Sequence, residues 1–483
     1  MIAKVPARAL FAALCLGAAL VFGADARAQS ATRPNIVMIV SDDHGRDDIG
    51  AYGSRTVRTP HIDALAREGL RFDNAFAATS SCSPSRATIL TGRMNHNTGM
   101  YGLEHEESHF STFDDVQSLP VRLKTAGYRT ARVGKFHVAP QAVFAFDEVL
   151  SQGQANQTVS LARSPAQMVE KAQAFVSERS NAPFFLYFAT DDPHRAFPFS
   201  IGDQPNSFGN RADGYPGVTE QTYDPSKVSV PAFLPDTPAV RDELAQYYQS
   251  ISRLDQGVGR LVALLKHTGH YDNTIIVYLT DNGIAFPGAK TTLYDPGVRA
   301  PLIMRLPHGA QAGRATDAMV SLADLTPTLL DLAGVAPGRA MDGRSFVSVL
   351  KDPAAPGWDE VFGSHTFHEV QMYYPMRSIR TRRWKLIYNI NPELTFPFAE
   401  DLLYASSWMQ NTKSGATSFG QRSVDAFLHR PRFELYDLQS DPGEIRNLAD
   451  DPAHGAVLAD LITRLKAFQT RTRDPWLRKW DFQ

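Results

Sequence analysis

The sequence predicts an α/β protein: a large sheet flanked by helices, followed by a smaller C-terminal part with antiparallel strands. From residue 35 to residue 332, continuous apolar runs of strand length alternate with amphipathic segments of helical period. After residue 332, Pro-Gly turns separate short strand-like runs. The chain has 483 residues, which is long enough for one large domain and a smaller one.

The first 28 residues have the pattern of a signal peptide. Lys4 and Arg8 accompany an apolar run over residues 9–23, and Ala26-Arg27-Ala28 has the small residues of a cleavage site. We therefore expect an exported protein, periplasmic or secreted. Beyond this leader no apolar run approaches the length of a membrane span. The formal net charge of −2 gives no indication of nucleic acid or an anionic membrane as a partner.

Each strand of the larger part is predicted from a continuous apolar run, because strands buried on both faces lack polar alternation. These runs lie at residues 35–40, 130–133, 184–189 and 274–280. Thr-Pro pairs open the first and the longest of the helices, since proline suits the first helical turn. The predicted helices lie at residues 60 to about 69, 118–126, 164–179, 238–266 and 322–332.

The C-terminal part follows a loop-rich linker that ends at Pro356-Gly357. Short antiparallel strands are predicted at residues 361–364, 377–382, 385–389 and 433–437, with a closing helix at about 456–468. We therefore expect a larger domain over residues 29–357 and a C-terminal subdomain over residues 358–483.

A further short helix is predicted directly after Cys82. Ser83 can serve as its N-cap, Pro84 suits the first helical position, and Gly92 can take the left-handed conformation that ends it. Cys82 would then lie at a helix N-terminus, where unpaired N–H groups favour anions. A lone cysteine is more often a packed thiol. Removal of the leader, which holds Cys15, leaves one cysteine in an oxidising compartment, and this indicates a chemical role.

Polar residues follow all four strands of the larger part, at the carboxyl ends where open α/β sheets bind ligands. Singly, such residues are usually turn formers or solvated side chains, but their agreement in position favours one shared site. Asp42 and Asp43 follow the first strand, and Asp281 and Asn282 follow the last. These hard oxygen donors favour Ca²⁺ or Mg²⁺ over zinc.

Basic side chains accompany this acidic set. Lys135 and His137 follow the second strand, and His194 follows the third. Arg86 lies one turn into the short helix, and Lys290 comes shortly after the last strand. A divalent cation surrounded by several bases is suited to a tetrahedral oxyanion ester.

The run Cys82-Ser83-Pro84-Ser85-Arg86, followed by Leu90-Thr91-Gly92, resembles the signature of the sulfatase family. The paired aspartates, Gly-Lys-x-His and Asp-Asn-Gly match the rest of that family's pattern. The resemblance implies an alkaline-phosphatase/sulfatase-like fold with a large mixed sheet. It also implies that a formylglycine-generating enzyme converts Cys82 to formylglycine. The implied ligands of Ca²⁺, or alternatively Mg²⁺, are Asp42, Asp43, Asp281 and Asn282.

The same resemblance implies roles for the basic residues. The hydrated formylglycine at position 82 would attack sulfur, activated by the metal and by Arg86. Lys135, His194 and Lys290 would hold the sulfuryl oxygens, and His194 or Lys290 would protonate the leaving group. His137 would then deprotonate the second hydroxyl, which expels sulfate and regenerates the aldehyde.

Further segments, up to Asp474-Pro475-Trp476, resemble the sulfatases that cleave the N-sulfate of glucosamine in heparan-type glycans. This implies a sulfated glucosamine saccharide as substrate, and it places His368, Glu369 and Arg377 at the pocket rim; exposed loop residues are the alternative interpretation. Lys290 departs from that branch, which carries an arginine there. The charge is kept, but the bidentate fork is lost.

Three functions fit these residues. The first is an exported sulfatase that acts on N-sulfated glucosamine. The second is an O-sulfatase or arylsulfatase, or a phosphonate or phosphate monoester hydrolase of the same superfamily, because a site with a metal and an arginine also accommodates phosphoryl groups. The third, a non-catalytic glycan-binding relative, is disfavoured because all the residues that carry the chemistry are present. The oligomeric state is left open, a homodimer included.

Overall fold

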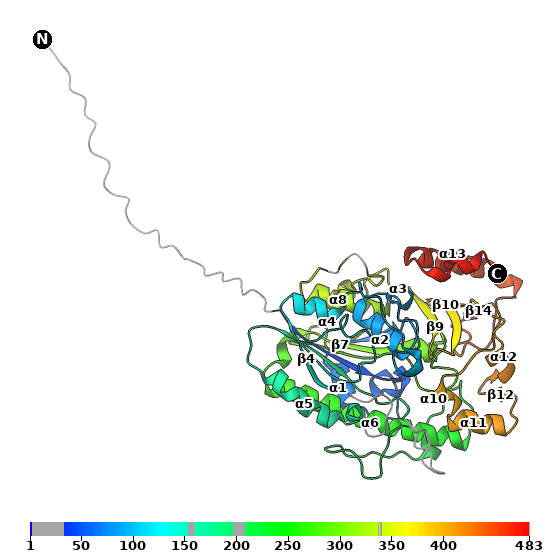
Figure 1. Cartoon of the computed structure of the whole chain (residues 1–483), viewed down its shortest axis with the longest axis horizontal. Coiled ribbons are helices and arrows are strands. Elements are labelled where there is room, and N and C mark those ends of the chain that lie inside the picture. The colour runs from blue at the N-terminus through cyan, green and yellow to red at the C-terminus, as the bar shows by residue number, and fades with distance from the viewer. Residues whose placement is uncertain (2–32, 153–159, 197–207, 337, 339–340, 483) are drawn as a thin grey trace. The chain divides into compact units, whose positions relative to one another are not determined.

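The large sheet has eight strands in the order β4-β3-β5-β1-β6-β7-β2-β8 (Figure 1). In the computed structural model the strands from β4 to β6 in this order pair in parallel. Strand β7 runs antiparallel to both neighbours, and β2 pairs in parallel with β8. The sheet is therefore mixed, as predicted. The strands are β1 (Asn35–Ser41), β2 (Leu70–Phe76), β3 (Arg129–Gly134), β4 (Glu148–Gln152), β5 (Phe184–Ala189), β6 (Thr274–Thr280), β7 (Arg299–Arg305) and β8 (Arg314–Ser321).

The structure describes Met1 and residues 33–152, 160–196, 208–336, 338 and 341–482. From Arg33 onward the chain forms one compact unit. Residues 2–28 of the predicted signal peptide lie outside the described residues. Among the described residues, no helix combines the length and the apolar character that a membrane crossing requires.

The four predicted strands of this sheet are confirmed as β1, β3, β5 and β6. The other strands lack a continuous apolar run. Strand β2 carries Arg71, Asp73 and Asn74, and its pairing with both neighbours is irregular near these residues. Strand β7 contains Pro301, while β4 and β8 lie at the two edges of the sheet. Periodicity therefore finds the central strands and misses those with polar or irregular positions.

Helices cover both faces of the sheet. They are α1 (Pro60–Arg67), α2 (Cys82–Thr91), α4 (Leu119–Thr125), α5 (Pro165–Ser177), α6 (Pro238–His267) and α8 (Leu325–Leu332). Because side chains alternate along a strand, Ile36, Met38 and Val40 of β1 pack with α2, α4 and α8. Val37 and Ile39 pack with α1, α5 and α6 on the opposite face (Figure 1). The predicted helices are confirmed.

A second sheet of four antiparallel strands, in the order β14-β11-β10-β9, lies in the C-terminal part. Its strands are β9 (Glu360–Phe367), β10 (Tyr373–Thr381), β11 (Trp384–Asn389) and β14 (Phe433–Asp437), and helix α13 (Gly455–Arg471) packs on it. The predicted strands and closing helix are confirmed. Ser364 of β9 donates its backbone N–H to the carbonyl of Ala78 (2.7 Å), which ties this sheet to the segment that leads into α2. The predicted domain boundary after residue 357 stays a prediction.

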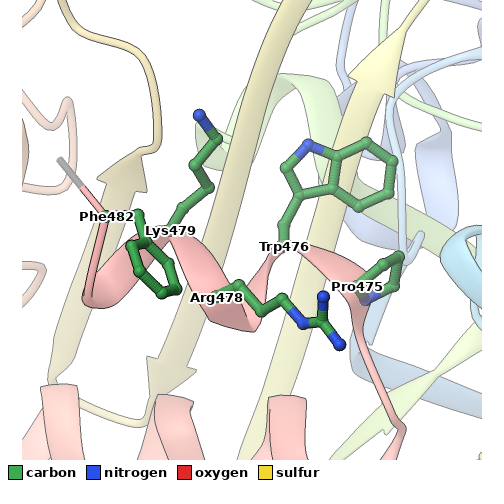
Figure 2. Close-up of a pocket in the computed structure, with 5 residues that line it drawn as sticks. All are labelled: Pro475, Trp476, Arg478, Lys479 and Phe482. Carbon is green, nitrogen blue, oxygen red and sulfur yellow. The ribbon is translucent and has the colours of Figure 1, made fainter.

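Short elements complete the chain: α3 (Asn95–Thr98), α7 (Asp295–Val298), α9 (Val347–Lys351), α10 (Glu400–Leu403), α11 (Ser406–Lys413), β12 (Ser418–Phe419), β13 (Arg422–Ser423) and α12 (Val424–Leu428). A 3₁₀ helix, Pro475–Trp480, follows α13, and its Trp480 ring stacks on Tyr388 with centroids 4.0 Å apart. A pocket of about 240 Å³ lies at this helix, lined by Pro475, Trp476, Arg478, Lys479 and Phe482 (Figure 2). No predicted site residue lines this pocket.

Candidate active site

The helix that carries Cys82 begins earlier than the sequence predicts. Ser81, in extended conformation, precedes α2, and Cys82 is the first helical residue. The expected N-cap, Ser83, lies inside the first turn, where its hydroxyl accepts the backbone N–H of Glu104 (3.0 Å). Pro84 fits this first turn because the first N–H groups of a helix have no partner within it. Gly92 ends the helix with a φ of 67°, as predicted.

The pairing of β1 with β6 brings three of the predicted metal ligands together. Ser41 lies opposite Thr280 in this parallel pair, so the residues that follow leave the sheet side by side. Oxygens of Asp42, Asp43 and Asp281 lie within 4.8 Å of one another. Asp281 Oδ1 also accepts the backbone N–H of Asp43 at 3.1 Å.

Burial sets the protonation of these carboxyl groups. It raises the pKa of Asp43 to about 6 and the pKa of Asp281 well above its usual range, and the charge of Asp42 adds to both shifts. For Asp42 burial acts in the same direction, but neighbouring charges, with Lys135 first among them, hold its pKa well below the usual range. Three carboxyl groups this close resist joint ionisation, and a bound divalent cation would favour it.

The donor set fits a hard divalent cation. Asn282 Nδ2 donates to Asp43, while Asn282 Oδ1 is buried and accepts no hydrogen bond from the described residues. Asp42 Oδ1 is also buried, and its ion-pair contact is Arg86 Nη2 at 3.3 Å. A buried acceptor without a hydrogen bond destabilises the fold. A cation with oxygen ligands would give both Asn282 Oδ1 and Asp42 Oδ1 a partner. The predicted set of four oxygen donors therefore lies together.

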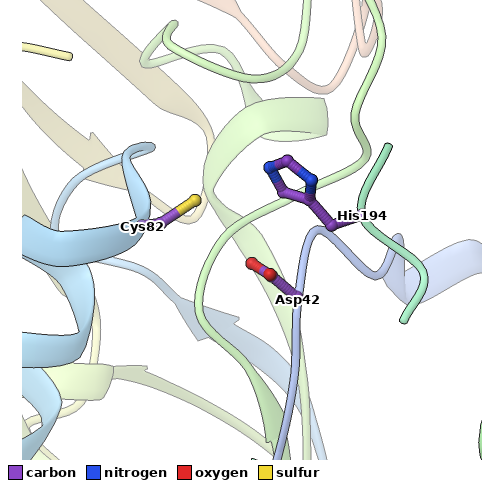
Figure 3. Close-up of side chains that lie close together, drawn as sticks. All are labelled: Asp42, Cys82 and His194. Carbon is purple, nitrogen blue, oxygen red and sulfur yellow. The ribbon is translucent and has the colours of Figure 1, made fainter. Parts of the chain in front are cut away.

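Cys82 faces this cluster across a short gap. Its Sγ, an oxygen of Asp42 and a ring nitrogen of His194 lie within 4.8 Å of one another. Figure 3 shows these side chains approaching from the N-terminus of α2, the loop after β1 and the loop after β5. Only 1% of Cys82 is exposed, and burial raises the pKa of its thiol well above the usual range. An unmodified thiol here stays protonated and is a poor nucleophile.

Arg86 crosses from the Cys82 helix to the acidic cluster. Its Nε and Nη2 atoms each lie 2.9 Å from Asp281 Oδ2, and Nη1 donates to the Tyr187 hydroxyl at 3.2 Å. The guanidinium is fully buried. It therefore balances part of the negative charge and fixes the position of Asp281 relative to α2.

Lys135 and His137 leave β3 at the same edge of the sheet. The Lys135 ammonium forms a buried ion pair with Asp42. His137 Nε2 lies 2.5 Å from Nδ1 of His105. Burial, with the charge of Lys135 second, lowers the pKa of His137 well below its usual range, so the ring is neutral. Its buried Nδ1 has no hydrogen-bond partner among the described residues, and such a nitrogen can accept a proton.

Lys290 joins His194 to two carboxylates. Its Nζ lies 2.9 Å from Asp43 Oδ2, 2.7 Å from Asp401 Oδ2 and 2.8 Å from His194 Nε2. Burial opposes its charge, but Asp401 and Asp43 hold the pKa of Lys290 well above its usual range. The ammonium donates to all three atoms, so His194 Nε2 is the acceptor. His194 Nδ1 then donates to the carbonyl of Arg195 (2.6 Å).

Buried arginines hold the loop that carries His194. Asp192 lies 3.0 Å from Arg163 Nη1 and 2.7 Å from Arg253 Nε. Arg163 also donates to the carbonyl oxygens of His194 and Arg195, each at 3.0 Å. The imidazole is therefore presented by a backbone fixed on both sides.

Two of the three predicted rim residues lie beside the site. His368 Nδ1 is 2.8 Å from the hydroxyl of Ser81, the residue before Cys82. Glu369 accepts the backbone N–H of Glu400 (2.9 Å), and burial raises the pKa of Glu369 to about 7. Both residues follow β9, so this end of the second sheet borders the approach to Cys82.

Arg377 has a different place from the one predicted. It lies fully buried in β10, where Nε and Nη2 donate to Asp474 at 2.6 and 2.9 Å. Its Nη1 donates to the carbonyl oxygens of His365 and Met376. The expectation of a rim position is therefore wrong, because an ion pair between β10 and the last segment of the chain occupies this guanidinium.

Two site residues have no signal in the sequence that marks them. Asp401 lies in the short helix α10, far along the chain from any strand of the large sheet. Its acidic neighbour Glu400 makes the pair look like ordinary first-turn residues of a helix. His105 lies in a loop beside Glu104 and reaches His137 only through the fold. Neither residue follows a predicted strand, which is the signal that identifies the metal ligands, Lys135, His137 and His194.

Comparison with known proteins gives the class of protein. The family described as "Sulfatase" matches residues 34–335, and the family described as "N-sulphoglucosamine sulphohydrolase, C-terminal" matches residues 288–399. The chain therefore belongs to the sulfatase family. Its resemblance to that family, carried by the run from Cys82 to Gly92, is confirmed.

Within the family, the chain is 39% identical to N-sulphoglucosamine sulphohydrolase of Homo sapiens over 463 residues, which cover 92% of each chain. It is 28% identical to an N-acetylglucosamine-6-O-sulfatase of Bacteroides thetaiotaomicron, over 93% of this chain and 89% of the relative.

Solved structures share the fold. One, described as a complex with its substrate D-glucosamine-2-N,6-O-disulfate, matches with a TM-score of 0.65 and 23% identity, over 92% of this chain and 99% of that one. The phosphonate monoester hydrolase of Agrobacterium radiobacter matches with a TM-score of 0.66 and 21% identity, over 91% and 96% of the two chains. The predicted fold class is confirmed.

Proposed function

We propose that this sulfatase-family hydrolase removes the N-sulfate group of glucosamine residues in heparan-type glycans and releases inorganic sulfate. The observation that carries the proposal is the 39% identity to human N-sulphoglucosamine sulphohydrolase over 92% of both chains. The grouping of Cys82 with Asp42 and His194 within 4.8 Å supports the proposal. It places the proposed nucleophile, residue 82, beside the proposed cation site and beside an imidazole that can transfer a proton.

Cys82 is the proposed precursor of formylglycine, whose hydrated aldehyde supplies a hydroxyl nucleophile where the buried thiol would be protonated. Asp42, Asp43, Asp281 and Asn282 are the proposed ligands of Ca²⁺, or of Mg²⁺, which would neutralise charge on the sulfo group. Maturation would require a formylglycine-generating enzyme, and we propose an exported location for the mature protein.

Lys135, Lys290 and Arg86 provide the positive charge for the sulfo group. The two ammonium groups are proposed to bind sulfuryl oxygens, where they would stabilise the charge that develops as the S–N bond lengthens. Arg86, fixed on Asp281, orients the side chain at position 82 from one helical turn away.

Breaking a sulfamate requires a proton on the departing nitrogen. Lys290 Nζ donates to His194 Nε2 at 2.8 Å, so the proton of this pair lies on the ammonium. Lys290 is proposed to give it to the departing nitrogen, either directly or through His194 Nε2. His137 is the proposed base for the second step, because its ring is neutral and its buried Nδ1 has no hydrogen-bond partner in the described part of the chain. His368 and Glu369 are proposed to contact the sugar; Arg377 is left out because of its ion pair with Asp474.

Sulfate release from glucosamine N-sulfate and from glucosamine 6-O-sulfate, measured side by side, tests this proposal. We expect clear preference for the N-sulfated sugar, with Cys82→Ala as the inactive control. Preference for the 6-O-sulfated sugar would overturn the N-sulfate specificity in favour of an O-sulfatase. Hydrolysis of phosphonate or phosphate monoesters, without release of sulfate from either sugar, would assign the chain to the other hydrolases of its superfamily.

A further inference from the structure

A cavity of about 680 Å³ lies next to the loops that carry the predicted metal ligands, and no predicted site residue lines it. One wall is formed by residues 45–48, which begin two positions after Asp43, and another includes Ile284, two positions after Asn282. Four arginines line it, and we call it the arginine cavity: Arg46, Arg55, Arg299 and Arg380. Its size is that of a binding site for a small organic molecule.

Three of the four guanidinium groups of this cavity, those of Arg46, Arg299 and Arg380, lie close together. Arg46 Nη2 is 3.8 Å from Asp73 Oδ1, and Arg299 Nη2 donates to the carbonyl of the same Asp73 at 2.9 Å. Burial lowers the pKa of Arg299, and the charges of Arg46 and Arg380 add to that effect. Like charges held this close repel each other, and an anion between them would relieve the repulsion.

Carboxylates at the cavity do not cancel this charge. Asp295 pairs with Arg380 at 3.0 Å, but it is shared with Lys385 at 2.8 Å. Asp48 is buried, and burial raises its pKa to about 8, so it is neutral at pH 7. The exposed Asp47 pairs with Arg46, and Asp73 is shared between Arg46 and Arg71. Four arginines line the cavity against the charged Asp47 and Asp295, so the lining keeps an excess of positive charge.

Two guanidinium nitrogens beside the cavity also lack an acceptor. The Nε atoms of Arg46 and Arg299 are buried, and neither has a hydrogen-bond acceptor among the described residues. Guanidinium groups bind sulfate, phosphate and carboxylate oxygens through their N–H groups. Phe233 and Tyr248 add aromatic surface to the lining, which suits the face of a sugar ring.

We propose that the arginine cavity is a second binding site for a sulfated saccharide, held through a sulfate group by Arg46, Arg299 and Arg380. The choice of a saccharide rests on the proposed function; the oxyanion site rests on the guanidinium groups alone. The cavity would then hold a sulfated sugar apart from the residue that is cleaved.

Crystals soaked in selenate, a sulfate analogue located by anomalous scattering of selenium, test the oxyanion site. We expect one selenium position in the arginine cavity and one near Cys82. Arg299→Gln or Arg46→Gln should remove the first and keep the second, whereas Lys290→Ala should weaken only the second. Arg58→Gln, an exposed arginine outside the cavity lining, is the matched control and should keep both. No selenium in the cavity, in crystals where the Cys82 site is filled, would overturn the proposal.

Calorimetry on the full chain with Cys82→Ala, which prevents turnover, tests the saccharide. The titrants are inorganic selenate and an N-sulfated heparan tetrasaccharide, each with and without Arg46→Gln. We expect the Arg46→Gln change to weaken saccharide binding at the cavity at least about tenfold. Equal cavity affinity for selenate and saccharide would mean that a free oxyanion only is bound and would overturn the saccharide assignment. Sulfate release measures the proposed function separately, so the two failures can be told apart.

Discussion

Two buried arginines, Arg86 and Arg377, have opposite surroundings. Arg86 contacts Asp281 and Asp42 in a cluster where the pKa values of two carboxyl groups are raised, so that charge set is incomplete. Arg377 meets Asp474 in a bidentate pair whose two charges cancel. An incomplete buried charge set points to a ligand, whereas a closed pair points to a structural role.

Removing a carboxylate from the incomplete set should have the largest effect. Asp281→Ala should abolish cation binding and lower kcat by about a thousandfold or more, because both depend on the same oxygens. Its melting temperature in chelator should change little, since relief of carboxylate repulsion offsets the lost contact with Arg86. Metal content by elemental analysis checks the assignment, with the exposed Asp272→Ala as control. Unchanged metal content in Asp281→Ala would contradict it.

Breaking the closed pair should affect stability instead. Arg377→Met leaves the Asp474 carboxylate buried without its partner, at a cost of about 3–5 kcal/mol in the free energy of unfolding. Urea unfolding measures this loss, and kcat per folded molecule should stay near that of the wild type. Arg382→Met removes exposed pairs with Asp317 and Asp359, at the turn that follows the same strand β10, and should cost only about 0–1 kcal/mol. A kcat loss that exceeds the unfolded fraction would show that Arg377 acts in the site.

The His194→Ala change tests whether His194 takes part in proton transfer to the leaving group. A departing nitrogen needs a proton, whereas a nitrophenolate leaves readily without one. We expect hydrolysis of glucosamine N-sulfate to fall about a hundredfold and hydrolysis of nitrophenyl sulfate to fall much less. Steady-state rates on both substrates check this. Equal losses would assign His194 to sulfo-group binding and not to proton transfer.

The smallest expected effect is a pH dependence from the closed pair. Burial opposes ionisation of Asp474, but Arg377 holds the pKa of this carboxyl well below its usual range. A depressed folded-state pKa gives stability that is present above the unfolded pKa of about 4 and is lost as pH falls below it. The free energy of unfolding should therefore fall less steeply below pH 4 in Arg377→Met than in the wild type. Equal slopes would contradict the ion pair's contribution.

Sequence alone was sufficient for the central strands of the large sheet and for the expectation that the polar residues after them lie together. Strands β1, β3, β5 and β6 are buried on both faces and read as apolar runs, and parallel pairing then brings their ends together. Strands β2 and β8 escape prediction because packing against neighbours, and not local apolar pattern, makes them strands.

Residues that reach the site from elsewhere could not be predicted in this way. Asp401 contacts Lys290 only because the C-terminal part folds back onto the large sheet. Arg377 has the charge expected of a substrate contact, but whether a guanidinium is free or paired depends on a partner 97 residues away, Asp474. Local sequence gives the chemistry of a side chain, whereas the tertiary contact decides its use.

The chemical state of residue 82 tests the central claim most directly. Mass spectrometry of the peptide that contains residues 82–86, taken from active protein, should show the sulfur of Cys82 replaced by oxygen and a carbonyl that reacts with hydrazides. This result would fit a buried position where a thiol remains protonated. An unmodified thiol in fully active protein would contradict the formylglycine mechanism and the function proposed from it.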